Sequence, residues 1–197
     1  MHEGTKREDR RVRRTKKLLT QALTKLMQEK KIKEITVKEL TELADMNRGT
    51  FYLYYKDIYN MVQQIEDGMF VMLEQLLARH EGMGLAAGIT PILQDIFRFV
   101  YENSDLCRAL LSPNGDITFL NRMNELLRKK CRTYWDTISV GKDEAKYEYY
   151  YSFCVSGCAG LIHAWLANSC REAPEQMAAL ACSMLRIDTI GENALKA

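Results

Sequence analysis

Apolar residues recur along the whole chain at spacings of three and four, which is the period of an α-helix. A stripe near the N-terminus shows this spacing clearly: Leu18, Leu19, Ala22, Leu23, Leu26 and Met27. No stretch alternates apolar and polar residues over the length of a β-strand between turn signals. The sequence therefore predicts an all-α fold.

Two short helices are predicted directly after the first one. Thr36 and Glu39 form a capping box that begins the second helix. Its core-facing residues are expected to be Val37, Leu40, Leu43 and Ala44. Asp45 and Asn47 mark a turn, because both residue types tolerate the left-handed conformation and Asn also caps helices. A third helix at about 48–55 then completes a pattern that is typical of a helix-turn-helix.

Longer helices are predicted in the rest of the chain, separated by glycine- or proline-containing loops such as residues 82–88 and 112–115. Their expected ranges are about 58–80, 91–103, 105–111, 116–138, 144–170 and 174–190. The sequence thus predicts a three-helix head in residues 1–57, which begins with a basic lead-in, and a helical bundle in residues 58–197.

The charges are distributed unevenly between these two parts. Residues 1–60 contain 15 Lys and Arg against 9 Asp and Glu, a net of +6, which leaves 13 against 17 in the remainder, a net of −4. Lys and Arg gain affinity for nucleic acid by displacing condensed counterions, so the basic head suggests a polyanionic partner. A solvated charged face is the alternative interpretation.

The helix-turn-helix pattern assigns roles in DNA binding by position. The second helix of such a pair lies in the major groove, and the side chains near its N-terminus contact base edges. Arg48 can bind guanine with two hydrogen bonds, and Gly49 lets the backbone approach closely. The free amides at the start of the preceding helix can bind a phosphate. The predicted DNA-binding residues are Thr36, Val37, Arg48, Gly49, Thr50, Tyr52, Tyr54 and Lys56.

Some residues of the head allow two interpretations. Phe51 and Tyr55 are spaced four apart and are expected in the core. Tyr52 either contacts phosphate or buries its ring while exposing its hydroxyl. The basic run at residues 10–17 either follows the DNA backbone or is a solvated tail.

The segments ITVKEL at residues 35–40 and MNRGTFYLYYK at residues 46–56 resemble the DNA-binding domain of the TetR family of bacterial regulators. The resemblance covers roughly residues 10–60 and implies that the third helix contacts DNA. Thr41 and Asp45 stand where this family usually has Ala and Gly. Ile58 replaces a common phosphate-binding Lys, so Lys56 is expected to supply that cation. Residues 55–59 also resemble a branch with short, divergent C-terminal domains, some of whose members resemble activators that work through a protein partner.

The resemblance implies that the body of the protein encloses a pocket for a small-molecule effector. Candidate pocket residues are Phe97, Tyr101, Phe119, Met123, Trp135 and Phe153. Ordinary core packing is the alternative, because Met and aromatic residues at helical spacing fill many helix bundles. The implied function is a DNA-binding regulator, a repressor controlled by a small molecule. A regulator or coactivator of the same fold that is controlled by a protein partner remains open.

A palindromic operator requires two heads, so we expect a homodimer. The two last predicted helices carry continuous seams with small residues that allow close helix packing. The predicted dimer contacts are Cys154, Gly157, Leu161, Ala164, Met177, Leu180 and Met184.

No set of nucleophile, base and orienting residue is recognisable, so we expect neither an enzyme nor a cofactor. Cys154 and Cys158 lie one helical turn apart, which suits a metal or redox pair as well as two packed structural thiols. His163 lies off that face, so we expect reduced structural thiols and no metal. No segment is long enough to span a membrane and no signal peptide is recognisable, so a cytoplasmic location is expected.

Overall fold

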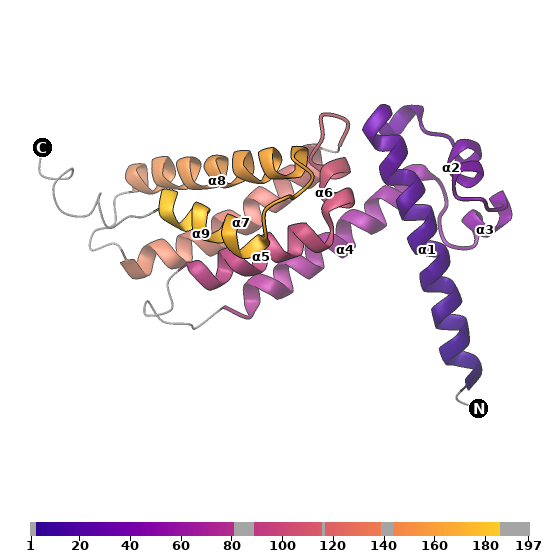
Figure 1. Ribbon diagram of the computed structural model, residues 1–197, viewed down its shortest axis with the longest axis horizontal. Helices are drawn as coiled ribbons and strands as arrows, with labels where there is room; N and C mark the ends of the chain where they lie inside the picture. The colour runs from indigo at the N-terminus through magenta and orange to yellow at the C-terminus, as the bar shows by residue number, and fades with distance from the viewer. Residues whose placement is uncertain (1–2, 81–88, 116, 139–143, 186–197) are drawn as a thin grey trace, which may run out of the picture. The chain divides into compact units, whose positions relative to one another are not determined.

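The computed structural model describes residues 3–80, 89–115, 117–138 and 144–185 (Figure 1). The described residues form helices and no strand, which confirms the predicted all-α fold. The α-helices are α1 (Glu3–Glu29), α2 (Val37–Leu43), α3 (Arg48–Tyr52), α4 (Ile58–Ala78), α5 (Thr90–Glu102), α6 (Ser104–Leu110), α7 (Ile117–Ile138), α8 (Glu144–Ala167) and α9 (Pro174–Met184). The predicted loop at residues 82–88 and the predicted end of the last helix near residue 190 lie outside the described residues.

The contacts within the chain define two compact units. Unit 1 consists of residues 1–69 and 105–119, and unit 2 consists of residues 70–104 and 120–197. Helix α4 contributes its first part to unit 1 and its last part to unit 2. The functional division after residue 57 stays a prediction.

Unit 1 is organised around the C-terminal half of α1, which packs against α2, while α2 packs against α3. Its almost completely buried apolar side chains include Leu19, Leu23, Met27, Leu40, Phe51 and Met61. Leu18, which was expected in the same stripe as Leu19, is 37% exposed at the edge of this core. The core therefore holds the helix-turn-helix on the second half of α1.

The turn between α6 and α7 is attached to the end of α1 within unit 1. The side-chain amide of Asn114 donates a hydrogen bond of 3.1 Å to the backbone carbonyl of Met27. A Cβ atom on Gly115 would overlap the backbone carbonyl of Leu110, so this turn has no room for a side chain at that position.

Unit 2 has a core of leucine side chains from α4 and α7 that packs against α5. Its buried members are Leu73, Leu76, Leu77 and Leu126. Helix α5 also packs along α9, where Arg98 donates a 3.0 Å hydrogen bond to Glu175. On α8, the buried ring of Trp165 contacts the ring of Phe97 of α5 at a centroid distance of 5.6 Å.

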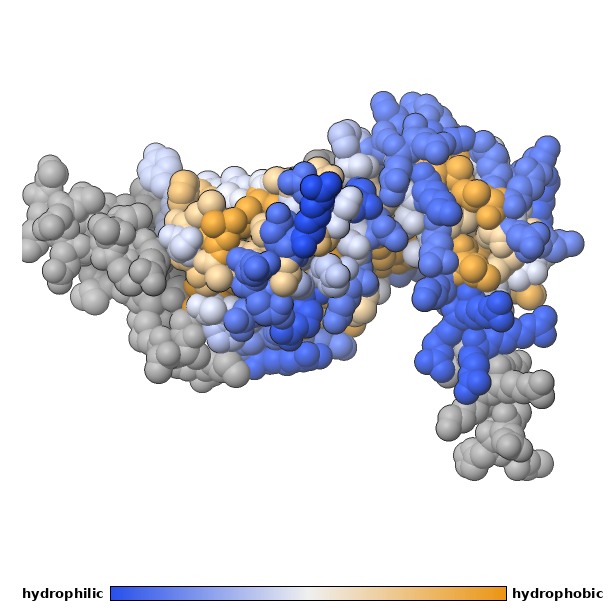
Figure 2. All heavy atoms as spheres, viewed as in Figure 1, coloured by the Kyte–Doolittle hydropathy of each residue, from blue (hydrophilic) through white to orange (hydrophobic). Residues whose placement is uncertain are grey.

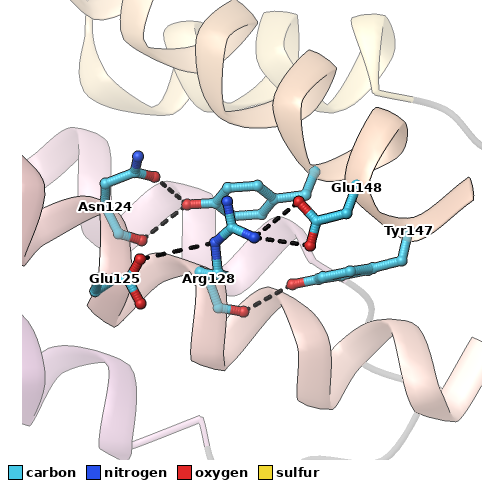
Figure 3. Close-up of polar contacts among 6 residues, drawn as sticks. Asn124, Glu125, Arg128, Tyr147 and Glu148 are labelled. Carbon is cyan, nitrogen blue, oxygen red and sulfur yellow. Dashed lines mark hydrogen bonds and ion pairs between the residues drawn. The ribbon is translucent and has the colours of Figure 1, made fainter. Parts of the chain in front are cut away.

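Polar contacts fix the rotation of α8 against α7 (Figure 3). Arg128 donates to both carboxylate oxygens of Glu148 at 2.7 Å, and the hydroxyl of Tyr147 donates to the carbonyl of Arg128 at 2.8 Å. The hydroxyl of Tyr151 donates to the backbone and side-chain oxygens of Asn124. These contacts hold the side of α8 that carries Tyr147 and Tyr151 against α7, where both rings are buried.

Candidate nucleic-acid interface

The predicted capping box is present at the start of α2. The hydroxyl of Thr36 accepts a hydrogen bond from the Glu39 amide at 3.2 Å, and the Glu39 carboxylate accepts one from the Thr36 amide at 3.1 Å. The ammonium of Lys30, the residue directly after α1, lies 2.7 Å from the same carboxylate. The hydrogen bond from Lys30, followed by those from Thr36, lowers the pKa of Glu39 to about 2. Thr36 is exposed and Val37 is half-buried, so this helix start lies at the surface.

The turn between α2 and α3 forms as the residue types predict. Asp45 has a φ of 52°, in the left-handed region that Asp tolerates. The side chain of Asn47 caps α3 by accepting a 2.8 Å hydrogen bond from the Gly49 amide. Thr41 is only 2% exposed, and its hydroxyl donates to the carbonyl of Val37 at 2.8 Å. This buried threonine allows a tight turn without leaving an unsatisfied hydroxyl.

The inward side of α3 agrees with the prediction. Phe51 is completely buried and Tyr55 is 5% exposed, with their ring centroids 5.5 Å apart. The helix ends at Tyr52, earlier than expected, and the backbone then continues in a turn. The two inward rings therefore fix which side of this segment faces solvent.

The opposite side of α3 carries most of the predicted DNA contacts. Arg48, Gly49, Tyr52 and Lys56 are exposed, and Tyr52 has an exposed fraction of 58%. Thr50 and Tyr54 are half-buried. Leu53 has an exposed fraction of 76% on this side, and it is absent from the predicted contacts because a leucine is ordinarily expected in the core. Its spacing of four from Gly49 was the signal that could have revealed it.

Helix α1 brings positive charge to the same unit. Residues 10–17 of this helix precede its first described buried residue, Leu19, and form a mostly hydrophilic surface (Figure 2). Its exposed cations are Arg10, Arg11, Arg13, Arg14 and Lys17. Lys16 is half-buried, with its ammonium 5.8 Å from the ring centroids of both Tyr54 and Tyr55. This cation–π contact links the basic stretch to the segment that follows α3.

The predicted dimer contacts divide into two groups in the isolated chain. Cys154 and Met177 are buried, and Leu161 is half-buried. The exposed group consists of Gly157, Ala164, Leu180 and Met184. Figure 2 shows hydrophobic residues gathered over α8 and α9. We call the exposed set Phe153, Gly157, Ala164, Leu180 and Met184 the α8/α9 face.

The predicted pocket residues belong to both compact units, and the pocket stays a prediction. Phe97 is buried in unit 2, whereas Phe119 is buried in unit 1. Tyr101 is 49% exposed and stacks on Trp165, and Phe153 is 66% exposed. Met123 is half-buried at the leucine core of unit 2. The side chain of Trp135 lies outside the described residues.

The described cysteines carry free thiols, most of them buried. None of the five is in a disulfide bond, and burial raises the pKa of the Cys158 thiol to about 11. The described residues contain no group of three or more potential ligands that could hold a metal ion. Among the described helices, none combines the length and hydrophobicity needed to cross a membrane.

Comparisons with known proteins relate this chain to transcription regulators. Residues 89–186 match the TetR C-terminal family model described as "Transcriptional regulator C-terminal region". A curated Bacillus subtilis (strain 168) protein, the "Uncharacterized HTH-type transcriptional regulator YxbF", is 37% identical over 49 residues. That match covers 25% of this chain, and the chain spans only 13% of the length of that relative.

Three solved structures share the fold. The TetR transcriptional regulator from Streptococcus agalactiae 2603V is 21% identical, with a TM-score of 0.59 and coverage of 92% of this chain and 98% of that one. FadR from Bacillus subtilis, solved with stearoyl-CoA, is 15% identical and has a TM-score of 0.61. The match covers 86% of this chain and 95% of FadR. The dihydroxyacetone kinase operon activator DhaS is 17% identical, with a TM-score of 0.55 and coverage of 87% and 93%.

A capped helix-turn-helix and a helical body that matches a regulator C-terminal region define this chain as a transcription regulator. The chain belongs to the TetR family.

Proposed function

We propose that the protein is a homodimeric regulator that binds a palindromic operator through the outward side of α3. The observation that carries this proposal is the two-sided arrangement of α3. Phe51 and Tyr55 anchor one side in the core, while Arg48, Gly49 and Tyr52 are exposed on the other. A helix held in this way can enter the major groove without losing its own packing.

The charges around α3 support a nucleic-acid partner. Lys56 lies just beyond the helix, and the exposed cations of α1 are linked to this segment through Lys16. The hydroxyl groups of Tyr52 and Tyr54 can donate hydrogen bonds to DNA phosphates. The backbone amides at the exposed start of α2, at Thr36 and Val37, can donate to a further phosphate. We assign phosphate binding to these groups and base recognition to Arg48, with Thr50 as a contact to either. The proposed place of action is the cytoplasm, where the regulator meets chromosomal DNA.

The α8/α9 face supports the proposed homodimer. Phe153 is 66% exposed, and Met184 is 61% exposed. Apart from α8's own backbone, a Cβ atom added to Gly157 or Gly160 would meet no atom of the described residues within 4 Å, so another helix can approach α8 closely there. Two copies of α8 and α9 would bury this face in a four-helix bundle and give the two heads that a palindrome requires.

We propose repression controlled by a small-molecule effector as the mode of regulation. The comparison that supports this proposal is FadR of Bacillus subtilis, a protein of similar fold that was solved with stearoyl-CoA. Effector binding in the body would then shift the equilibrium between conformations of different operator affinity.

Control by a protein partner is the second candidate. Tyr149 is 78% exposed on α8, beside the exposed Phe153, and exposed aromatic side chains are typical of protein interfaces. The similar structure of an operon activator, DhaS, is compatible with this alternative.

Selection from random DNA duplexes with the full-length protein tests the DNA-binding function. The expected result is an enriched sequence with two inverted half-sites, bound at nanomolar concentrations in a gel shift at physiological salt. Enrichment of no sequence, with binding equal for all duplexes, would overturn the proposal. A fluorescence screen of acyl-CoA and other small molecules for release of the selected operator then tests effector control.

A further inference from the structure

Leu53 has the most exposed large apolar side chain among the described residues of unit 1, at 76%. Single exposed apolar residues are common on protein surfaces, so this exposure does not by itself indicate a function. The position of Leu53 is more informative, because it follows α3 directly and lies between two of the proposed DNA-contacting tyrosines.

The backbone holds Leu53 on the outward side of this segment. Its φ of −67° and ψ of −24° continue the helical conformation of α3 for one residue. Leu53 lies four residues after Gly49, which places both on one side of a helical turn. The amides of Tyr54 and Tyr55 both donate to the carbonyl of Phe51 at 3.0 Å, which closes the turn around Leu53.

The chemistry of the leucine side chain limits what it can recognise on DNA. It has no hydrogen-bond donor or acceptor, whereas the base edges in the major groove present polar groups and one apolar group, the 5-methyl of thymine. Gly49, on the same side, has no side chain that would keep Leu53 away from the groove.

We propose that Leu53 is a specificity-determining residue that contacts the 5-methyl group of a thymine in each half-site of the operator. This inference rests on the proposed DNA-binding function. The basic surroundings of Leu53 favour DNA over an apolar protein partner, because Arg48 and Lys56 lie on either side of it in the sequence and both are exposed.

The experiment compares thymine with deoxyuridine, which lacks only the 5-methyl group. Each thymine of the selected operator is replaced in turn by deoxyuridine, and the dissociation constants of the wild type and of Leu53→Ala are measured by fluorescence anisotropy. A buried methyl group contributes about 0.8 kcal/mol, which corresponds to about fourfold in affinity. We expect one position per half-site where deoxyuridine weakens the wild type about fourfold and leaves Leu53→Ala unchanged.

Two further variants control this comparison. Leu43 is another exposed leucine of unit 1, on α2, and Leu43→Ala is expected to keep the wild-type response to deoxyuridine. Leu53→Met retains an apolar side chain and is expected to retain the preference for thymine. Circular dichroism of all variants shows whether each head is folded.

The possible results separate this inference from the proposed function. A deoxyuridine scan without any weakened position, or with equal weakening of the wild type and Leu53→Ala, would overturn the role of Leu53 while leaving DNA binding intact. Failure to select any operator would instead overturn the DNA-binding function itself.

Discussion

The side-chain amide of Asn114 donates a 3.1 Å hydrogen bond to the backbone carbonyl of Met27, a residue 87 positions earlier in the sequence. Met27 lies in the last turn of α1, where carbonyl groups have no partner within the helix. Asn114 therefore supplies a cap to α1 from the turn between α6 and α7. The hydroxyl of Ser112 accepts a 3.2 Å hydrogen bond from the backbone amide of Asn114 and so supports this turn.

Asn114→Ala is expected to lower the free energy of unfolding by about 1 kcal/mol, because one side-chain hydrogen bond is lost. Gly115→Ala is expected to lower it by about 1–3 kcal/mol, because the added Cβ forces the turn to shift away from Leu110. Urea titrations measure both effects. Asn121→Ala, at an exposed position of α7, is the matched control and should change stability little. Equal stability of all three variants would contradict the capping role.

Glu39→Gln is expected to destabilise the protein at neutral pH and to have less effect in acid. The pKa of Glu39 is about 2 in the folded state, below the ordinary value of 4.5. The stabilisation is therefore fully present above pH 4.5 and is lost as the pH falls towards 2. Urea titrations of both proteins between pH 7 and pH 2.5 measure this difference in stability. A difference that stays constant down to pH 2.5 would show that the Glu39 charge contributes nothing.

Arg48→Ala is expected to reduce affinity for the selected operator by about 1–3 kcal/mol and to relax the base preference at one base pair. The reason is the loss of a bidentate hydrogen bond between arginine and guanine. Binding to a series of base-substituted operators measures both changes. If the preference at every position were unchanged, Arg48 would be a phosphate contact and not a base contact.

Neutralising the α1 cations and Lys56 is expected to weaken binding to all sequences alike. Each phosphate contact contributes about 0.9 to the slope of log affinity against log salt concentration, so the slope should become shallower. Variants that carry Gln at Arg10, Arg14 and Lys17, with or without Lys56→Ala, are measured between 50 and 200 mM salt, a range in which such slopes are steep. A slope identical to that of the wild type would refute this assignment.

Gly157→Leu is expected to produce a folded monomer that has lost tight operator binding. The structure makes this test sharp, because a Cβ atom at Gly157 would meet no side chain and no other element of the described chain within 4 Å. Analytical ultracentrifugation gives the oligomeric state, and circular dichroism gives the helicity. Ser152→Leu, at an exposed position of the same helix, shows whether any added leucine has this effect. A wild type that is monomeric at micromolar concentration would refute the dimer.

Local residue chemistry was sufficient to predict the helix-turn-helix. The preferences of Thr36, Asp45 and Asn47 are local to each residue. The structure confirms Thr36 at the start of α2, Asp45 in the left-handed conformation and Asn47 as the cap of α3. The prediction for Leu43 was wrong, because this residue is 48% exposed while Thr41 is buried instead. The position of α1 decides which side of the seven-residue α2 is covered, and the local pattern of α2 does not contain that information.

The orientation of α8 was not predictable in the same way, because its apolar residues surround the whole helix and allow several seams. The polar contacts of Glu148 and Tyr151 with α7 select one orientation, and their partners lie 20 and 27 residues away in the sequence. This orientation buries Cys154 within its own chain and leaves Phe153 exposed. The spacing of residues in the sequence could not decide whether the predicted pocket exists. Helical spacing is the same for side chains that line a cavity and for side chains that fill a packed core.

The apolar α8/α9 face has a consequence for the dose response of the regulator. If pairing through this face precedes operator binding, only paired chains are competent, and at concentrations below the pairing constant their number varies with the square of the total amount of chain. At an operator that is far from saturated, halving the amount of protein would then lower occupancy about fourfold instead of twofold. A regulator built in this way converts a modest change in its own synthesis into a steep change in transcription.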